Sequence, residues 1–417
     1  MPQFTLEEII KATNGQLLTA GSHRQITGVS IDSRRLVPGD VFFALKGPNF
    51  NGHDFAAAAA EKGAAAIVCS RAPELHAAWR GAVIKVPDTL LAYGDLARFH
   101  RQRYAIPVIG ITGSNGKTTT KELVAAVLSV RYKVVKTEKN FNNEIGLPQT
   151  LFQIDETTEA VVVEMGMRGA GQIAYLTRLA QPTVGIITNI GVTHLELLGT
   201  REAIAAAKGE LIAGLPPSGL AVLNGDDPLV TPMAALFPGE SLFYSLRKPD
   251  GQAKIVPALY MVAAATKGEQ EVVTADGRWG EFEFTLPLLG RHNIANALAA
   301  LTAGLSLGLT TDEAVRGLQG VNPVENRLRK IDAGGIMVLD DTYNASPPSV
   351  QAALEVLRNL DNPGRKIAVL GDMLELGPLA REAHQQIGEL TAAYGCVALF
   401  AYGPLSAATV EGAAQKG

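Results

Sequence analysis

The stretch ITGSNGKTTTKE, residues 111–122, decides the fold of this chain. A standard phosphate-binding loop carries a glycine five residues before its Gly-Lys pair, but that position is Ile111 here. Residues 113–116 still lie between an expected strand and a helix start, where free backbone N–H groups and the helix dipole favour a phosphate. Lys117 can reach outer phosphates, and the Thr118 hydroxyl can bind Mg²⁺. A plain turn is the weaker alternative, so the stretch indicates a nucleotide site with a shortened loop.

The pattern around this loop is that of an α/β protein. Apolar runs alternate with helix-like segments from about residue 105 to 215, which predicts a parallel sheet covered on both faces. Between about residues 242 and 286 three segments are strand-like, SLFYSL, KIVPALYMVAAAT and GEFEFTL, which indicates an antiparallel extension, and a helix over 293–308 follows.

The length of 417 residues predicts three domains. Residues 1–85 form a small α/β domain with one alanine-rich helix over 54–62. Residues 86–320 form the central domain. A turn-rich segment with Pro323 places a boundary near 321, and residues 321–417 form a Rossmann-like α/β domain.

The composition limits the class of partner. The net charge of −4 gives no general attraction to nucleic acid, so local groups must hold any anionic substrate. The start is acidic where a secretory leader would be basic, and no run reaches the roughly 20 apolar residues of a membrane span. We therefore expect a cytoplasmic protein with no membrane insertion. Cys69 and Cys396 lie in apolar runs, which favours buried strand positions over a disulfide.

Further candidate residues follow the central strands. Glu164 ends the run AVVVEMG and His194 follows the next strand, and ligands gather beyond the carboxyl ends of parallel strands. His194 alone could equally be an ordinary loop histidine. From its own segment, Lys208 is expected to be a solvated helix residue. The asparagines in NFNNEIG, residues 140–146, could orient a sugar or phosphate or could only satisfy turns.

Taken together, these motifs resemble those of the Mur ligases of cell-wall synthesis, whose shortened loop T-G-x-x-G-K-T is what residues 112–118 spell. The resemblance runs over essentially the whole chain, because the following motifs match in order: DSRRLVPGDVFFALKGPNFNGHDF, TGSNGKTTTKE, NFNNEIGLPQTL, EMGMRGAGQI, NIGVTHLELLGTREAIAAAKGE, GRHNIANALAA, DDTYNASPPS and GDMLELG. The TTTKE, NNEIG and DDTYNASP stretches are most similar to the branch that adds D-alanyl-D-alanine to UDP-N-acetylmuramoyl-tripeptide.

The resemblance implies a role for each matching position. Lys117, Glu164, His194 and Lys208 would be catalytic, with Lys208 as a carbamate. ATP would be bound by Gly113, Ser114, Asn115, Gly116, Lys117, Thr118, Thr119, Asn293, Asn296, Arg327, Asp341 and Asn344. Mg²⁺, as two ions, would be held by Thr118, Glu164, His194 and the Lys208 carbamate. The UDP end of the substrate would be bound by Ser33, Arg34 and Lys46 in the N-terminal domain, and further substrate contacts would come from Asn140, Asn142 and Asn143.

Two departures from the family pattern stand out. Asn326 precedes Arg327 where the family often has glycine, and the chain stops at AAQKG where members usually continue to a final strand, so we expect a shortened last domain. The resemblance implies a monomeric ATP-dependent ligase working through an acyl phosphate. The alternatives are a Mur-type ligase with another acceptor, and a nucleotide-binding regulator without turnover. The third residue of the tripeptide, lysine or diaminopimelate, stays open.

Overall fold

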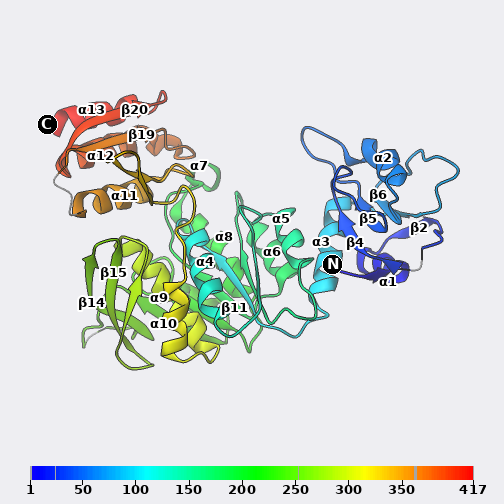
Figure 1. The fold of residues 1–417 in the computed structure, drawn as a ribbon, viewed down its shortest axis with the longest axis horizontal. Helices are drawn as coiled ribbons and strands as arrows, with labels where there is room; N and C mark the ends of the chain where they lie inside the picture. The colour runs from blue at the N-terminus through cyan, green and yellow to red at the C-terminus, as the bar shows by residue number, and fades with distance from the viewer. Residues whose placement is uncertain (1, 24, 252, 361–363, 417) are drawn as a thin grey trace. The chain divides into compact units, whose positions relative to one another are not determined.

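The computed structural model describes residues 2–23, 25–251, 253–360 and 364–416. The chain has the three-domain α/β architecture that its sequence predicts, with mixed sheets (Figure 1). Its contacts group into two compact units, which are taken in turn. They are Met1–Val108 with Lys133–Met165 and Tyr175–Gln181, and Ile109–Tyr132 with Gly166–Ala174 and Pro182–Gly417. The predicted boundaries at residues 85 and 320 stay predictions.

The first unit holds an N-terminal sheet of order β2-β7-β6-β5-β4, parallel except where β2 joins β7. Every residue of β5 and β6 is buried, which explains why these runs read as continuously apolar. Its elements are β1 (Phe4–Thr5), α1 (Leu6–Thr13), β2 (Gln16–Thr19), β3 (Gln25–Ile26), β4 (Gly28–Ser30), β5 (Asp40–Phe43), η1 (Gly52–Phe55), α2 (Ala56–Glu61), β6 (Ala66–Cys69), β7 (Ala82–Lys85), α3 (Thr89–Arg101), β9 (Val134–Lys136), α5 (Gly146–Leu151) and β10 (Ala160–Glu164).

An aromatic cluster joins distant segments of this unit. Phe4 packs edge-on against His100 and Phe152, and Tyr93 packs against Phe43 and Phe152. Such ring pairs add about 0.5–1.5 kcal/mol each beyond the area that they bury.

The central strands of the second unit run in the order β16-β15-β14-β13-β12-β11-β8. Pairing is parallel from β8 to β14 and antiparallel from β14 to β16. The predicted antiparallel extension is therefore correct for β14 onward and wrong for β13, whose crossover from β12 makes it parallel. The elements are β8 (Val108–Thr112), α4 (Lys117–Ser129), β11 (Val184–Ile187), α7 (Leu195–Leu198), α8 (Arg201–Ala213), β12 (Leu220–Asn224), η2 (Thr231–Leu236), β13 (Glu240–Ser245), β14 (Leu259–Lys267), β15 (Gln270–Gly277), β16 (Phe282–Leu286), α9 (Arg291–Ser306) and α10 (Thr311–Gln319); α6 (Gln172–Ala180) starts in this unit.

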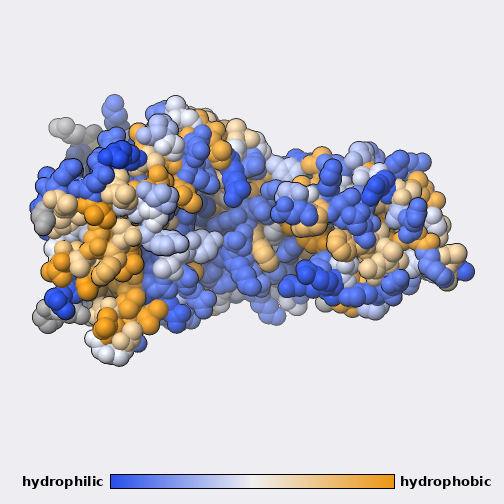
Figure 2. Space-filling model, turned by 90° about the horizontal axis from the view of Figure 1, so that it is seen from above, coloured by the Kyte–Doolittle hydropathy of each residue, from blue (hydrophilic) through white to orange (hydrophobic). Residues whose placement is uncertain are grey.

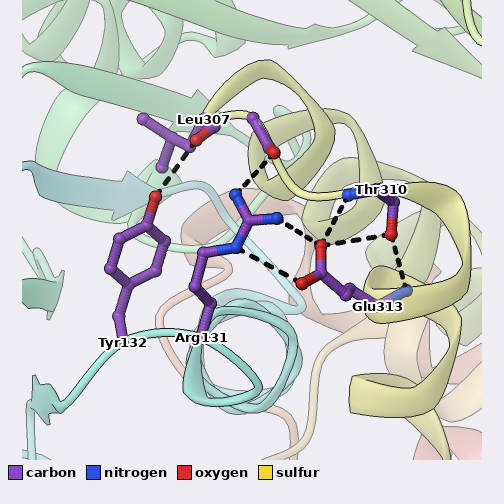
Figure 3. A network of polar contacts seen from close by, with 6 residues as sticks. Arg131, Tyr132, Leu307, Thr310 and Glu313 are labelled. Carbon is purple, nitrogen blue, oxygen red and sulfur yellow. Dashed lines mark hydrogen bonds and ion pairs between the residues drawn. The ribbon is translucent and has the colours of Figure 1, made fainter.

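A polar network fixes the far end of α4 to the junction of α9 and α10 (Figure 3). Arg131 donates to the Gly308 carbonyl (2.7 Å) and to both oxygens of Glu313, and the Tyr132 hydroxyl donates to the Leu307 carbonyl (3.2 Å). Glu313 also completes a capping box with Thr310 at the start of α10. The helix that begins at the phosphate loop is thus anchored at both ends.

The C-terminal segment alternates strands and helices, and α12 and α13 lie beside β19 and β20 (Figure 1). Its strands pair as an antiparallel β17–β18 and a parallel β19–β20. The elements are β17 (Arg329–Asp332), β18 (Met337–Asp340), α11 (Pro347–Asn359), β19 (Lys366–Gly371), η3 (Gly377–Leu379), α12 (Ala380–Ala393), β20 (Cys396–Tyr402) and α13 (Ala407–Lys416).

Two glycines let α12 and α13 pack with their backbones almost touching. A Cβ on Gly388 would lie 1.9 Å from the Thr409 carbonyl oxygen, and one on Gly412 would lie 2.1 Å from the Gln385 carbonyl oxygen. Any side chain at either position would force the helices apart.

The surface mixes hydrophobic and hydrophilic residues on the face shown in Figure 2. Exposed hydrophobic side chains in β19 and β20 are Ile367, Val369, Val397, Phe400 and Tyr402. Within the described part of the chain, no helix combines the length and the apolar character that crossing a membrane requires. Cys69 is buried as predicted, whereas Cys396 is only half-buried, and both are free thiols.

Candidate nucleotide and metal site

Two glycines shape the loop between β8 and α4. Gly113 has φ +154°, and a Cβ there would lie 1.8 Å from the Thr188 hydroxyl oxygen. Gly116 has φ +81°, and a Cβ there would lie 2.6 Å from Oδ1 of Asn296. Both positions therefore require glycine, for conformation and for space.

The segment after β11 holds this loop in place. The Thr188 hydroxyl donates to the Asn115 carbonyl (2.6 Å), and Asn189 both accepts from the Asn115 N–H (3.0 Å) and donates to the Asn115 carbonyl (3.0 Å). The Gly191 N–H donates to the Ser114 hydroxyl (2.8 Å). The loop is thus pre-shaped by its own unit, as a phosphate cradle requires.

Two lysines converge on one carbonyl of the loop. Nζ of Lys117 donates to the carbonyls of Gly113 (2.9 Å) and Ser114 (3.2 Å), and Nζ of Lys208 donates to the same Gly113 carbonyl (3.0 Å). Lys208 is only 2% exposed, and burial, followed by the nearby Lys117 charge, lowers its pKa well below the ordinary value. The expectation of a solvated lysine, drawn from its helix alone, was wrong.

Residues of the C-terminal segment reach the same loop. Nη2 of Arg327 donates to the Thr118 hydroxyl (3.1 Å), and its guanidinium lies 4.2 Å from the centre of the Tyr343 ring. Ser346 donates to Oδ1 of Asn115 (3.0 Å), a contact that sequence reasoning missed although the residue lies in the DDTYNASPPS motif. The arginine and the metal-binding hydroxyl predicted from sequence are therefore brought together.

Asp341 lies close behind this arginine. Its Oδ1 accepts from the Leu328 N–H (3.1 Å), and burial raises its pKa to about 6 although Arg327 opposes the shift. Asn344 is exposed.

His194 occupies a strained position beside the loop. It is a non-glycine residue with φ +68°, at the start of α7. Its Nδ1 lies 2.5 Å from Oε2 of Glu375, although the angle at the ring is not that of an aligned hydrogen bond. Burial lowers the His194 pKa, and the Glu375 carboxylate acts in the opposite direction.

The two asparagines of α9 are buried at the back of the loop. Asn296 accepts from the Thr120 hydroxyl (3.2 Å) and donates to Asn293 (3.3 Å), which itself donates to the Leu289 carbonyl (2.8 Å). They support the loop in this structure, and their predicted contact with the nucleotide stays a prediction. Thr119 is half-buried.

Glu164 ends β10 in the first unit, and its carboxylate is buried. One oxygen accepts from Nδ2 of Asn142 (2.7 Å), whereas Oε2 has no hydrogen-bond partner among the described residues. A buried carboxylate oxygen without a donor is costly unless a cation or water satisfies it. Asn143 instead accepts from the Ile145 and Gly146 N–H groups, so this asparagine serves the turn before α5. Asn140 is exposed.

The N-terminal candidates are not gathered into one set of contacts. Ser33 is buried, Lys46 is exposed, and the Arg34 side chain is 87% exposed and pairs with Asp32. That pairing lowers the pKa of Asp32 to about 2. Their role in binding the UDP end stays a prediction.

In the part of the chain that the structure describes, no three His, Cys, Asp or Glu side chains gather into a group that could hold a metal ion. The residues expected to bind Mg²⁺ are chemically suited to it all the same, because a threonine hydroxyl and a carboxylate are hard oxygen ligands and Oε2 of Glu164 is unsatisfied.

The loop, its converging lysines and the polar groups around Thr118 define an α/β enzyme that binds the phosphates of a nucleotide. The middle domain model of the Mur ligases matches residues 111–304, their glutamate ligase domain model matches 326–417, and the catalytic domain model of the family matches 25–101. The chain belongs to the Mur ligase family and is an ATP-dependent ligase.

Relatives and solved structures agree with this assignment. The chain is 39% identical to the UDP-N-acetylmuramoyl-tripeptide--D-alanyl-D-alanine ligase of Bacillus subtilis, covering 99% of this chain and 88% of that protein. It is 42% identical to the ligase of the same name from Synechocystis, covering 90% and 79%. A crystal structure of MurF from Acinetobacter baumannii matches with TM-score 0.91 and 30% identity over 99% of this chain and 88% of that one. MurF of Thermotoga maritima in complex with ADP matches with TM-score 0.78 and 28% identity over 93% and 96%.

Proposed function

We propose that this enzyme joins D-alanyl-D-alanine to the C-terminal carboxylate of UDP-N-acetylmuramoyl-tripeptide in peptidoglycan precursor synthesis. The observation that carries the proposal is the near full-length match to relatives that bear this name. The contacts around the loop support it, because they provide what phosphoryl transfer to a carboxylate needs.

The reaction runs in two steps. A carboxylate oxygen of the tripeptide attacks the γ-phosphorus of ATP, and the bond from that phosphorus to the oxygen bridging the β- and γ-phosphates breaks. The products of this step are an acyl phosphate and ADP. The amine of D-alanyl-D-alanine then attacks the acyl carbon, phosphate leaves, and the amine loses a proton. Two anions meet in the first step, so neutralising charge dominates it.

Lys117 supplies part of that charge. Its ammonium rests on the carbonyls of Gly113 and Ser114 and can turn to the outer phosphates when ATP enters. The loop N–H groups bind phosphate oxygens, and Arg327 donates from the C-terminal segment. Mg²⁺, bound by Thr118, Glu164 and His194 in this proposal, would neutralise further phosphate charge.

Lys208 would serve as a carbamate. Because burial lowers its pKa, the amine is neutral far more often than that of an exposed lysine, and a neutral amine can attack the carbon of CO₂ and lose a proton. The resulting anion could hold a second Mg²⁺. Intact-mass spectrometry in bicarbonate should show a gain of one CO₂ that Lys208→Met abolishes, and no gain in wild type would refute the carbamate.

Closure of the C-terminal segment would complete the site. Arg327 and Ser346 already contact the loop, and Asp341 lies behind Arg327. We expect Asp341→Ala to slow turnover much more than it weakens ATP binding. Equal losses in turnover and binding would contradict closure.

The deciding experiment is ATP-dependent phosphate release with UDP-N-acetylmuramoyl-tripeptide, with and without D-alanyl-D-alanine, and with product mass measured in parallel. Release that needs both substrates, with a mass gain of one dipeptide, is expected. Release with a different amine would indicate a Mur-type ligase with another acceptor. ATP binding without release would indicate a regulator. The cytoplasmic location and the monomeric state expected from the sequence stay predictions.

A further inference from the structure

The GDMLELG motif, residues 371–377, has no role in the mechanism above, yet it contacts the strained histidine. It forms the loop between β19 and α12. Met373 and Leu376 are buried in the C-terminal core, and Val192, from the loop between β11 and α7, packs against that same core. The loop is therefore anchored on one side and pressed against the segment before His194 on the other.

The backbones of the two segments touch. The Glu196 N–H donates to the Glu375 carbonyl (3.3 Å), and a Cβ on Gly377, which has φ +54°, would lie 3.5 Å from Cα of Glu196. Glu375 has φ +61°, so two non-glycine residues in the left-handed region, Glu375 and His194, face each other. Such strain is kept only where the surroundings impose it.

One polar contact lies at the centre of this junction. Oε2 of Glu375 is 2.5 Å from Nδ1 of His194, close enough for the carboxylate to accept from an Nδ1–H. The contact of the His194 ring with another described residue is through Nδ1, and no hydrogen bond to its Nε2 occurs among the described residues. A metal-binding imidazole commonly donates from its other nitrogen to a carboxylate, which fixes the ring and the tautomer.

We propose that Glu375 is a positioning residue that holds Nδ1–H of His194 and so presents Nε2 to the metal and phosphates. The proposal rests on the proposed function in one respect, the assignment of His194 as a metal ligand. Because Glu375 belongs to the C-terminal segment and His194 to the segment between β11 and α7, the ring is oriented only while the C-terminal segment is docked. Docking of the segment and binding of the metal are thereby coupled.

The competing explanation is that the contact only helps the segment to dock. Glu375→Ala removes the carboxylate, whereas Glu375→Gln keeps the shape of the side chain and one oxygen that can accept a hydrogen bond. Glu382→Gln is the matched control, because Glu382 is an exposed residue of α12 whose carboxylate accepts from Gln386 (3.2 Å) of the same helix rather than from His194.

The first measurement is ¹⁵N NMR of the histidine rings in the full chain, with the His194 signals assigned by their loss in His194→Asn. We expect the Nδ1–H tautomer in the wild type, in Glu375→Gln and in Glu382→Gln, and a mixture of tautomers in Glu375→Ala. The same tautomer in Glu375→Ala as in the wild type would overturn the proposal. This readout does not depend on ligase activity, so failure of the proposed function would be seen separately.

The second measurement is calorimetric binding of ADP with and without Mg²⁺. A positioning role predicts that Glu375→Ala lowers the affinity for ADP in the presence of Mg²⁺ by about 10- to 100-fold. The affinity for ADP without Mg²⁺ should stay unchanged. Equal losses with and without Mg²⁺ would show that the carboxylate only docks the segment, and would refute the positioning role.

Discussion

Replacing Gly113 with alanine tests whether the phosphate loop is as tightly constrained as its contacts indicate. The new Cβ would lie 1.8 Å from the Thr188 hydroxyl oxygen and 3.0 Å from Cβ of Thr188, so the threonine must rotate. Rotation breaks its 2.6 Å hydrogen bond to the Asn115 carbonyl, although Asn189 still donates to that oxygen. The residue must also keep a φ of +154°, which side chains rarely adopt.

These effects can be summed. Backbone strain of ~1–3 kcal/mol and a lost hydrogen bond of ~0.5–1.5 kcal/mol predict that the free energy of unfolding falls by ~1.5–4.5 kcal/mol. Urea unfolding measures this directly, and ADP binding should weaken because the loop N–H groups move with Asn115.

Two variants make the test specific. Gly169→Ala is the matched control, because a Cβ at this loop glycine meets nothing within 4 Å. Thr188→Ala in the Gly113→Ala background removes the hydroxyl clash and should restore part of the stability. A loss of ~0.5 kcal/mol or less in Gly113→Ala, within the range of ordinary surface substitutions, would refute the reasoning.

Three further substitutions test other parts of the structure. Thr310→Ala removes the capping box of α10 and should lower the free energy of unfolding by about 1 kcal/mol in urea titrations, whereas no change would show that the cap is idle. Tyr244→Phe removes a buried hydroxyl that donates to the carbonyls of Ile187 (3.3 Å) and Thr188 (3.2 Å), at a cost of ~0.5–1.5 kcal/mol in the same assay. Burial raises the pKa of Asp341 from 3.8 to about 6, so the folded state binds more protons and stability falls as pH rises through that window. Asp341→Asn should remove this fall and be more stable above pH 6 by ~1–2 kcal/mol, reduced from the full shift because solvent still reaches the group; melting temperatures that fall equally with pH in both proteins would contradict it.

The central strands could be predicted because the sheet buries them completely. Every residue of β8, β10 and β11 is buried, so each appears in the sequence as a continuous apolar run. The direction of β13 could not be predicted, since it depends on how the chain crosses over from β12 rather than on the strand's own residues. β9 has three residues and β15 mixes polar with apolar positions, so neither was anticipated.

The site residues could likewise be predicted where local sequence places them, and could not where contacts with distant residues place them. The loop from Gly113 to Thr118 could be predicted because consecutive residues form it between a buried strand and the start of a helix. Lys208 could not be placed from its helix, because the structure buries it against the Gly113 carbonyl, far away in sequence. Asn142 and Asn143 are neighbours of one type, yet only the first reaches Glu164, because the second is used by a turn. Glu375 lies in the GDMLELG motif, but its contact with His194 could not be predicted, because the two residues are far apart in the sequence.

The glycine crossing of α12 and α13 has a mechanical consequence. With backbones in contact at Gly388 and Gly412, the two helices cannot slide without breaking van der Waals contact along both. The loop that carries Glu375 leads directly into η3 and α12, so its position is tied to that of the packed helix pair. A displacement of α13 would therefore also move α12, the Glu375 loop and the imidazole of His194. The NMR signal of this one histidine ring would report the position of the whole C-terminal segment.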